Sequence, residues 1–598
     1  MKTAIRLSDL WRAPDRRLLV FAVTAPLAVW VGFIGTSLQQ AEQVVRHATY
    51  YVLLLAFVLL VAAMVRMRGA WFPPGQAPSR REWIAVLILI GVLSSMAWRS
   101  EPWRAKVLND EFVLQITAYS LHHYRTAATM ARAYELEGVF FPLWDYLDKR
   151  PCFYPFLVSL LHDATGYRVA NAFLVNALLY PVLLAAAWWL ARRFGGVRAG
   201  LLAPLLLGTL PLLAQNATGA GMEMTNLVML LLSACLAVLF LEQPADRHRL
   251  SAFTLAVVLL CHSRYESALF VGLGGLVILA AWWKQRRVLL AWPVTLAPLL
   301  LIPFALQQRI LANTPDRWEL SEGKSERFSL GYVPDNLLRA GRFFFGEAPS
   351  IANSVWLSSV GAVGIAWLLW RLFRHRRLRW SEWTADAQAV TPFAAGVVAN
   401  LCLVMAYYWA GLDDPVAARF ALPFYCLLAV LGAVAIAALD AAGRLTRVAA
   451  GGTVVFMLAV SIPQMGRHAY SNLGSREHEW LVRMVQARPP AKRIVIASRS
   501  SMVWLLHRIP SILISRAIFM QDRLHYQFAK GDFDEILVTQ ELRPASKDGF
   551  HEVVPDDRLP GAFHLELVAE KRFGTKLLRL SRLVAVDAPT IQREAGGR

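Results

Sequence analysis

Long apolar runs are the sequence feature that most constrains how this chain can fold. A helix needs about 20 residues, at ~1.5 Å each, to cross the ~30 Å hydrocarbon core of a bilayer. Hydrophobic residues make up 56% of the 598 positions, and runs of roughly the spanning length recur along most of the chain. Thirteen such runs are predicted as spans: residues 18–38, 50–65, 83–98, 169–190, 197–213, 222–241, 250–262, 265–283, 289–308, 351–370, 392–410, 420–439 and 448–462. We therefore predict a polytopic α-helical membrane protein whose first run is an uncleaved helix.

Basic residues between the runs predict the orientation of the chain, because Lys and Arg concentrate in cytoplasmic loops. If the N-terminus lies inside, the short outer connections are residues 39–49, 214–221 and 411–418. Together they contain a single Lys or Arg, Arg46. The inner connections contain Arg66, Arg68, Arg80, Arg81, Arg192, Arg193, Arg198, Arg247, Arg249, Lys284, Arg286, Arg287, Arg371, Arg374, Arg376, Arg377, Arg379, Arg444 and Arg447. This pattern predicts a cytoplasmic N-terminus. It also accounts for the net charge of +20 without nucleic-acid binding.

A polar cluster, His-Ser-Arg-Tyr-Glu, interrupts the apolar sequence at residues 262–266. One straight helix over residues 250–283 would be ~51 Å long, far longer than a membrane span. It would also invert the orientation of every later helix, against the distribution of basic residues. We therefore predict two helices separated by a recessed break. Two interpretations stay open: Arg264 and Glu266 form a pair that joins the helices, or they face a hydrated cavity and serve a function.

The composition divides the chain into five predicted regions. They are three membrane helices (1–98), a first large external loop with amphipathic helices and a catalytic motif (99–168), the remaining membrane core with an external loop at 309–350 (169–463), an external α/β domain (464–589) and a disordered tail (590–598). The α/β prediction rests on the change to a more polar composition and on short patterned segments. These are β-type runs at 493–497, 535–539, 563–568 and 577–584, and helical stretches near 477–486 and 501–507.

Asp110 and Glu111 lie near the start of the first external loop. Adjacent side chains point in different directions on a helix or a strand, which argues against a paired-acid site. A single carboxylate where a span emerges can act as a general base, with its pKa tuned by a partly apolar site. The alternative, that both residues simply favour the first turn of a helix, stays open.

Lys149 and Arg150 lie at the other end of the same loop, before an apolar amphipathic segment. Cations at this position can contact an anionic lipid head group, or they can anchor the helix at the membrane surface. The sequence has no CxxC metal motif, and the adjacent His122 and His123 lack the i, i+4 spacing of helical metal ligands. We therefore predict no set of metal ligands, and the use of a divalent ion stays open.

Taken in order, these motifs resemble those of the membrane-embedded GT-C glycosyltransferases, in particular the branch with the protein O-mannosyltransferases and the lipid A aminoarabinose transferases. The similar segments are NDE at 109–111, KRPCFYPFLVSLL at 149–161, TGYRVAN at 165–171, ARRFGG at 191–196, the Arg-containing break at 262–266 and RFALPFY at 419–425. There are two departures from the family pattern. Cys152 replaces the second proline of its Pro-Pro motif, and three predicted spans precede the Asp-Glu loop where the family usually has one.

The resemblance implies a GT-C fold and the inverting transfer of a hexose or pentose from a polyprenyl-phosphate donor to a lipid, glycan or protein acceptor. It implies a catalytic pair in which Asp110 is the general base and Glu111 orients it or the acceptor. A lipid phosphate leaves readily, so the site needs cations rather than a general acid. The expected phosphate contacts are Arg264, Lys149, Arg150 and Arg419, and the residues expected to line the substrate cavity are Tyr154, His262, Tyr265 and Glu266.

The same resemblance implies a bacterial inner-membrane protein whose C-terminal domain is periplasmic. Its expected partners are the lipid bilayer, the polyprenyl-phosphate-linked sugar and an unidentified acceptor. A lipid or glycolipid transporter or flippase is the main alternative, although transporters usually contain paired repeats with broken helices at the midplane. A non-catalytic envelope assembly protein is the third interpretation.

Overall fold

The computed structural model describes residues 16–73, 75–136, 139–314, 320, 324, 326–346, 351–375, 383–489, 491–498, 501–545 and 551–588. The predicted tail at 590–598 and the predicted inner residues Arg376, Arg377 and Arg379 lie outside these ranges. The chain divides into two compact units. The helical unit comprises Met1–Val107, Leu121–Ala127 and Lys149–Ala469, and the sheet unit comprises Leu108–Ser120, Ala128–Asp148 and Tyr470–Arg598.

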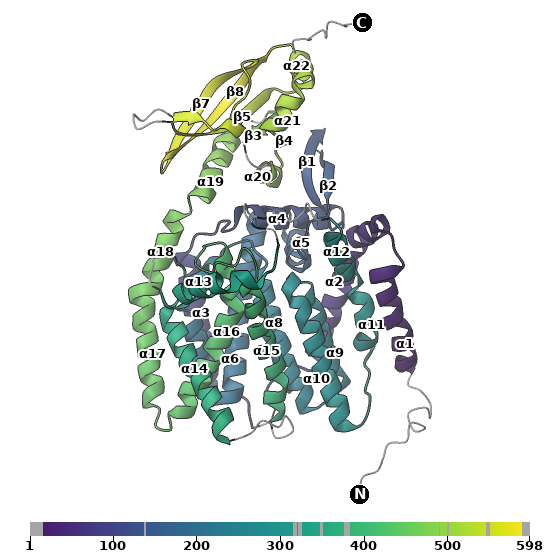
Figure 1. Cartoon of the computed structure of the whole chain (residues 1–598), viewed down its shortest axis with the longest axis vertical. Helices are drawn as coiled ribbons and strands as arrows, with labels where there is room; N and C mark the ends of the chain where they lie inside the picture. Colours follow the sequence, from purple (N-terminus) through teal and green to yellow (C-terminus); the bar gives the residue numbers. More distant parts are fainter. Residues whose placement is uncertain are drawn as a thin grey trace. The chain divides into compact units, whose positions relative to one another are not determined.

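Within the described part of the helical unit, 11 helices are long and apolar enough to cross a membrane, which confirms the predicted polytopic helical class (Figure 1). They are α1 with the π-helical η2 (Arg16–Val29, Trp30–Ile34), α2 (Leu38–Arg66), α3 (Arg80–Ser100), α6 (Ala170–Leu207), α8 (Glu223–Glu242), η4 with α10 (Tyr265–Ala268, Leu269–Gln285), α11 with α12 (Trp292–Leu300, Ile302–Ala312), α14 (Val355–His375), α15 (Ala385–Met405), η8 with α16 (Ala417–Ala421, Leu422–Leu439), and α17, η9 and α18 (Arg444–Phe456, Met457–Ser461, Ile462–Ser471). The shorter elements are η3 (Arg68–Ala70), α5 (Phe153–Thr165), α7 (Pro211–Ala217), α9 (Arg247–Cys261), η6 (Leu330–Tyr332) and α13 (Val333–Phe345).

Helix α6 contains two of the predicted spans, joined at Gly196. The backbone of Gly196 is not helical, with φ 71° and ψ −169°, a conformation readily available only to glycine. The segments on the two sides of Gly196 fold back on each other. A Cβ atom added at Gly200 would lie 2.9 Å from the Cβ of Arg192 and 3.1 Å from Cδ1 of Trp188, a closeness that a straight helix does not allow. Helix α9 has 15 residues, fewer than a span normally needs. The count of thirteen spans therefore stays a prediction.

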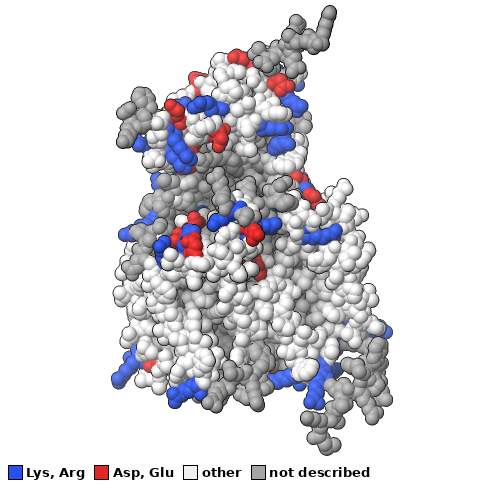
Figure 2. All heavy atoms as spheres, viewed as in Figure 1, with Lys and Arg blue, Asp and Glu red and all other residues white. Residues whose placement is uncertain are grey.

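Ion pairs join several helix ends at one end of the helical unit. Arg192 Nε lies 2.5 Å from Glu82 Oε1 at the start of α3. Arg193 binds Asp386 at the start of α15, with an Nε–Oδ2 distance of 2.8 Å, and also contacts Glu242 at the end of α8. All these segments were predicted to lie on the inner side, and the structure brings them together at one end of the helical unit. Lys and Arg side chains are visible at this end, the lower edge of the helical unit in Figure 2.

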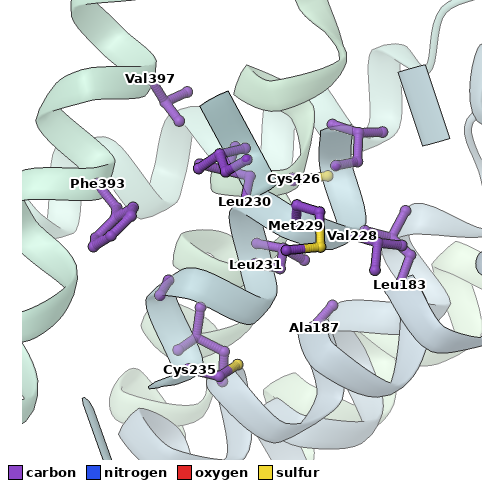
Figure 3. Packing of buried hydrophobic residues seen from close by; sticks show 14 of the residues in the cluster. Leu183, Ala187, Val228, Met229, Leu230, Leu231, Cys235, Phe393, Val397 and Cys426 are labelled. Atoms are coloured by element: carbon purple, nitrogen blue, oxygen red, sulfur yellow. The ribbon is translucent and has the colours of Figure 1, made fainter. Parts of the chain in front are cut away.

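The core of the helical unit is built around α8, which is almost entirely buried. Apolar side chains from α6, α8, α15 and α16 gather in one cluster around it (Figure 3). The labelled members are Leu183, Ala187, Val228, Met229, Leu230, Leu231, Cys235, Phe393, Val397 and Cys426. Because α8 is central, the acidic residue in its first turn, Glu223, lies in the interior of the unit.

The sheet unit contains a mixed sheet with the strand order β4-β3-β5-β8-β7, and β6 pairs with β5. Strand β3 runs parallel to β4 and β5, whereas β8 runs antiparallel to β5 and β7. The strands are β3 (Arg493–Ala497), β4 (Ser511–Leu513), β5 (Glu535–Pro544), β6 (His551–Val553), β7 (Phe563–Phe573) and β8 (Lys576–Val586). The helices are α19 (Leu473–Gln486), α20 (Met502–Leu506), α21 (Ile514–Phe519), α22 (Gln521–Lys530) and η10 (Pro555–Asp557). Each predicted strand and helix of this region is present, which confirms its α/β character.

A β-hairpin also belongs to the sheet unit and was not predicted. It consists of β1 (Thr129–Leu136) and β2 (Val139–Tyr146), which pair antiparallel. Residues far along the chain hold it: Ser501 Oγ donates to the carbonyl of Ala131 at 3.2 Å, and the rings of Tyr134 and Phe533 are 6.4 Å apart. The predicted loop at 99–168 is therefore divided between the two units, and the predicted domain boundaries stay predictions.

Candidate functional site

Three helix termini meet inside the helical unit, at the end opposite the Arg192 and Arg193 ion pairs. They are the start of α8, the break between α9 and η4, and η8 at the start of α16. The predicted break at 262–266 is present, because α9 ends at Cys261 and η4 begins at Tyr265. The three termini contribute Glu223, Arg264 and Arg419, respectively.

These three side chains form a buried cluster, here called the Arg–Glu–Arg cluster. Nη1 of Arg264 and Nη1 of Arg419 both donate to Oε1 of Glu223, at 2.9 and 3.0 Å. A second carboxylate, that of Glu266, lies 2.5 Å from Nε of Arg264. The ring of Phe420 lies beside both guanidinium groups, with Cζ–centroid distances of 5.3 Å for Arg264 and 5.8 Å for Arg419. The two cations are thus balanced by two carboxylates, as buried charges require.

Local contacts place the carboxylate of Glu223. The turn before α8 is held by Asn176, whose Nδ2 donates to the carbonyls of Gly219 and Gly221 at 2.9 and 2.8 Å. A Cβ atom at Gly221 would lie only 2.3 Å from Oε2 of Glu223, so a larger residue here would displace the carboxylate. On the other side, Ser267 Oγ in η4 donates to Oδ1 of Asn226 in α8 at 2.6 Å. The first turn of α8 is therefore tied to both α6 and η4.

The predicted phosphate-contact segment at 149–154 lies beside the same break. The backbone N–H of Phe153 donates to the carbonyl of His262 at 3.1 Å. Arg150 is buried, and its carbonyl accepts from Nε2 of Gln307 at 3.0 Å. The structure therefore brings the start of α5 to the segment that contains Arg264. Lys149 is half-buried at the same point.

Two residues predicted to line a substrate cavity make internal hydrogen bonds, and their place at a cavity stays a prediction. The hydroxyl of Tyr154 is fully buried and donates to the carbonyl of Ala172 at 2.9 Å. The ring of His262 is also buried, with Nε2 lying 3.0 Å from the carbonyl of Leu300. These contacts favour a role in holding the site together. Tyr265 and Glu266, both in η4, are half-buried and lie next to Arg264 in the chain.

The predicted catalytic carboxylates lie in the first turn of α4 (Leu108–His123), within the sheet unit. Glu111 is buried and Asp110 is half-buried. Within this unit the ring of Phe112 stacks on that of His478, at a centroid distance of 5.6 Å. A position in the first turn fits both interpretations of these acids, a general base and a helix-start preference. Their catalytic roles stay predictions.

A second polar cluster joins the end of α4 to the end of α5. Nδ1 of His122 lies 2.6 Å from Oδ1 of Asp163, and Nη1 of Arg125 donates to Oδ2 of Asp163 at 2.8 Å. Partial burial acts to raise the pKa of Asp163, but the hydrogen bonds from Arg125 and His122 hold it below its usual value. Burial, with the neighbouring His122 and His123, lowers the pKa of His162 to about 4.

One further carboxyl group has a shifted pKa. Burial raises the pKa of Glu101, between α3 and α4, to about 7, despite Lys106 at 3.4 Å. Across the described ranges, no group of three or more His, Cys, Asp or Glu side chains is placed to hold a metal ion. The predicted lack of a metal-ligand set stays a prediction, and the use of a divalent ion stays open.

Sequence analysis did not single out Glu223, Asn226 or Phe420. Glu223 carried a usable signal, since it is an acidic residue inside the predicted span 222–241, where charge is costly unless it is paired. Its partners, however, are 41 and 196 positions away along the chain. Phe420 gave no distinct signal among the many aromatic residues of the spans.

The helical membrane unit, the broken helix with a buried arginine and the C-terminal sheet unit together define a polytopic membrane protein of the GT-C fold. Comparison with solved structures supports this assignment. ArnT from Cupriavidus metallidurans, an aminoarabinose transferase, matches in its complex with undecaprenyl phosphate at 12% identity and a TM-score of 0.50, over 84% of this chain and 98% of that one. Its apo form matches at 13% identity and a TM-score of 0.50, over 83% and 97%. No family model matches the sequence, and no curated protein matches it.

Proposed function

We propose that this protein is a polyprenyl-phosphate-dependent glycosyltransferase that acts at the outer face of a bacterial inner membrane. The observation that carries the proposal is the Arg–Glu–Arg cluster, which holds two arginines side by side in a membrane unit of GT-C fold. The fold match to ArnT, whose structure contains undecaprenyl phosphate, supports the choice of a lipid phosphate as the ligand.

The arginine pair provides the phosphate contact. A guanidinium has five N–H donors in a fixed fork that suits phosphate oxygens. Glu223 Oε1 accepts one bond from each arginine, and in this proposal a phosphate oxygen takes the place of that carboxylate oxygen. Charge-assisted bonds of this kind stabilise the negative charge that develops on a leaving phosphate. Lys149 and Arg150 would add positive charge from the start of α5.

The acceptor is activated by Asp110 in this proposal. The carboxylate accepts the proton of the acceptor hydroxyl while the acceptor oxygen forms a bond to the anomeric carbon. The bond from that carbon to the phosphate oxygen breaks, and its electron pair leaves with the polyprenyl phosphate. Attack on the face opposite the phosphate inverts the anomeric carbon. Glu111 orients Asp110 or the acceptor, and the sugar is a hexose or a pentose.

Binding of undecaprenyl phosphate to the purified protein, measured by native mass spectrometry, tests the donor site. We expect Arg264→Lys to weaken binding roughly 10-fold or more, because the forked donor geometry is lost. Arg309→Lys is the matched control. This half-buried arginine of α12 donates to Thr36 Oγ1 at 3.0 Å, outside the Arg–Glu–Arg cluster. If the unmodified protein and both variants bind undecaprenyl phosphate with equal affinity, Arg264 does not contact the phosphate.

Transfer itself distinguishes the proposed enzyme from a transporter. The protein is reconstituted in liposomes with labelled polyprenyl-phosphate sugars and envelope lipids. A glycosylated product together with released polyprenyl phosphate is expected. Movement of intact labelled lipid between the leaflets, with no new product, would instead identify a flippase.

A further inference from the structure

Helix α13 (Val333–Phe345), between α12 and α14, has three distinct faces. Residues three and four apart share a face of a helix. One face is buried and comprises Asn336, Ala340, Phe343 and Phe344. A second face is apolar and exposed, and a third carries Asp335, Arg339 and Arg342. A helix of a compact protein needs only one apolar face, so the second one needs an explanation.

The buried face fixes α13 against the rest of the helical unit. Nδ2 of Asn336 donates to the carbonyls of Met405 and Tyr407, at 2.9 and 3.0 Å. The ring of Phe344 packs against those of Phe424 and Tyr425 in α16, at centroid distances of 5.6 and 5.2 Å. These contacts determine the rotation of the helix about its axis. The other two faces therefore have fixed directions.

The second face exposes large apolar side chains in a row. Leu337 is 62% exposed, Leu338 57% and Phe345 56%, and Leu330, in η6 immediately before the helix, is 83% exposed. A Cβ atom added at Gly341, between them on the same face, would meet nothing within 4 Å. Single exposed leucines are ordinary, but a contiguous apolar row marks an interaction surface.

The surroundings of α13 indicate what covers this row. The helix contacts α14 and α15, and these membrane-spanning helices also expose large apolar side chains, including Val363, Leu369, Val398 and Leu403. A helix with an apolar face beside a basic polar face is typical of segments that lie in the interfacial layer of a bilayer. Arg342 is exposed on the polar face, where it can reach anionic head groups.

We propose that α13 docks on the bilayer itself, with the row Leu330, Leu337, Leu338 and Phe345 in the acyl-chain boundary and Arg342 at anionic phospholipid head groups. The helix also contacts the connection between α15 and η8. Arg339 Nε lies 2.5 Å from Oδ1 of Asp413, in the connection that leads to Arg419. Asn336 holds the start of the same connection. The docking of α13 on the bilayer is independent of the proposed sugar transfer.

Site-directed spin labelling tests this proposal in nanodiscs of phosphatidylcholine and phosphatidylglycerol. Among the described cysteines only Cys402 is exposed, so labels are introduced as Leu338→Cys or Asp335→Cys in a Cys402→Ser background. Collision rates are measured with oxygen, which concentrates in the bilayer, and with a water-soluble nickel chelate. We expect the label at 338 to favour oxygen and the label at 335 to favour nickel.

A label at 338 that favours nickel as strongly as the label at 335 would overturn the proposal. A label at 338 that neither reagent reaches would also overturn it, because a protein surface would then cover the row. The head-group contact is tested with Arg342→Gln and with nanodiscs that lack phosphatidylglycerol. Each change should lower the ratio of oxygen to nickel collisions at 338, and an unchanged ratio in both would refute the anionic contact.

Discussion

Glu223 and Arg419 are 196 positions apart in the chain and form a buried ion pair, with an Nη1–Oε1 distance of 3.0 Å. The same carboxylate oxygen accepts a bond from Arg264. One acidic residue at the start of the central helix thus sets the separation of two cations that come from different helix termini. The proposed phosphate site depends on that carboxylate as much as on the arginines.

Replacing the shared carboxylate should cost both stability and ligand binding. Glu223→Gln leaves one buried guanidinium charge without compensation, which typically costs about 3–5 kcal/mol. We expect a clear fall in the melting temperature in detergent and weaker binding of undecaprenyl phosphate. The control is Glu42→Gln, which removes a more exposed pair with Arg46 and should cost about 0–1 kcal/mol. Similar melting temperatures for the two variants would contradict the importance given to Glu223.

The close approach of Gly221 to Glu223 gives a second prediction. Gly221→Ala places a Cβ atom 2.3 Å from the present position of Oε2, so the carboxylate must move away from the arginines. We expect a lower melting temperature and weaker binding of undecaprenyl phosphate. Gly272→Ala in α10 is the matched control, because its Cβ would meet nothing within 4 Å. That change should be neutral or stabilise by about 0.5–1 kcal/mol, since alanine favours a helix. A harmless Gly221→Ala would show that the carboxylate position is not critical.

The polar cluster at the ends of α4 and α5 predicts acid sensitivity. His162 has its pKa lowered to about 4 by burial, so the unfolded chain binds its proton more readily than the folded one. Protonation of His162 therefore does not reduce the free energy of unfolding above pH ~6.5. As the pH drops toward 4, the free energy of unfolding falls by at most about 3 kcal/mol. The lowered pKa of Asp163 acts in the same direction at lower pH. Melting temperatures of the protein and of His162→Gln between pH 4 and 7 test this.

The exposed His248, at the start of α9, provides the control for that series. His248→Gln should keep the pH dependence of the unmodified protein, whereas His162→Gln should flatten it. Parallel curves for all three proteins would mean that His162 does not control the acid response.

The proposed general base predicts a selective loss of catalysis. Asp110→Asn keeps the size of the side chain but cannot accept the proton of the acceptor, so transfer should fall about 10²–10⁴-fold. Binding of undecaprenyl phosphate should be unchanged. Asp145→Asn, in β2 of the same unit, should retain transfer. Unimpaired transfer by Asp110→Asn would remove the base assignment, and the helix-start interpretation would take its place.

The membrane fold could be predicted from the sequence because spanning helices leave apolar runs of characteristic length. The break at 262–266 and the turn at Gly196 were also foreseeable, since polar residues and glycines interrupt those runs. The Arg–Glu–Arg cluster could not be predicted, because its members come from three distant segments of the chain. The β1–β2 hairpin was missed for the same reason, as Ser501 and Phe533 hold it. Patterns within a short window do not contain such contacts.

Mass spectrometry of envelope lipids and glycans tests the central claim, polyprenyl-phosphate-dependent sugar transfer, most directly. Cells with the protein, cells without it and cells with Asp110→Asn at equal expression are compared. The account predicts one class of molecule that is lighter by a single sugar residue both without the protein and with Asp110→Asn. An envelope that is identical in all three would contradict it.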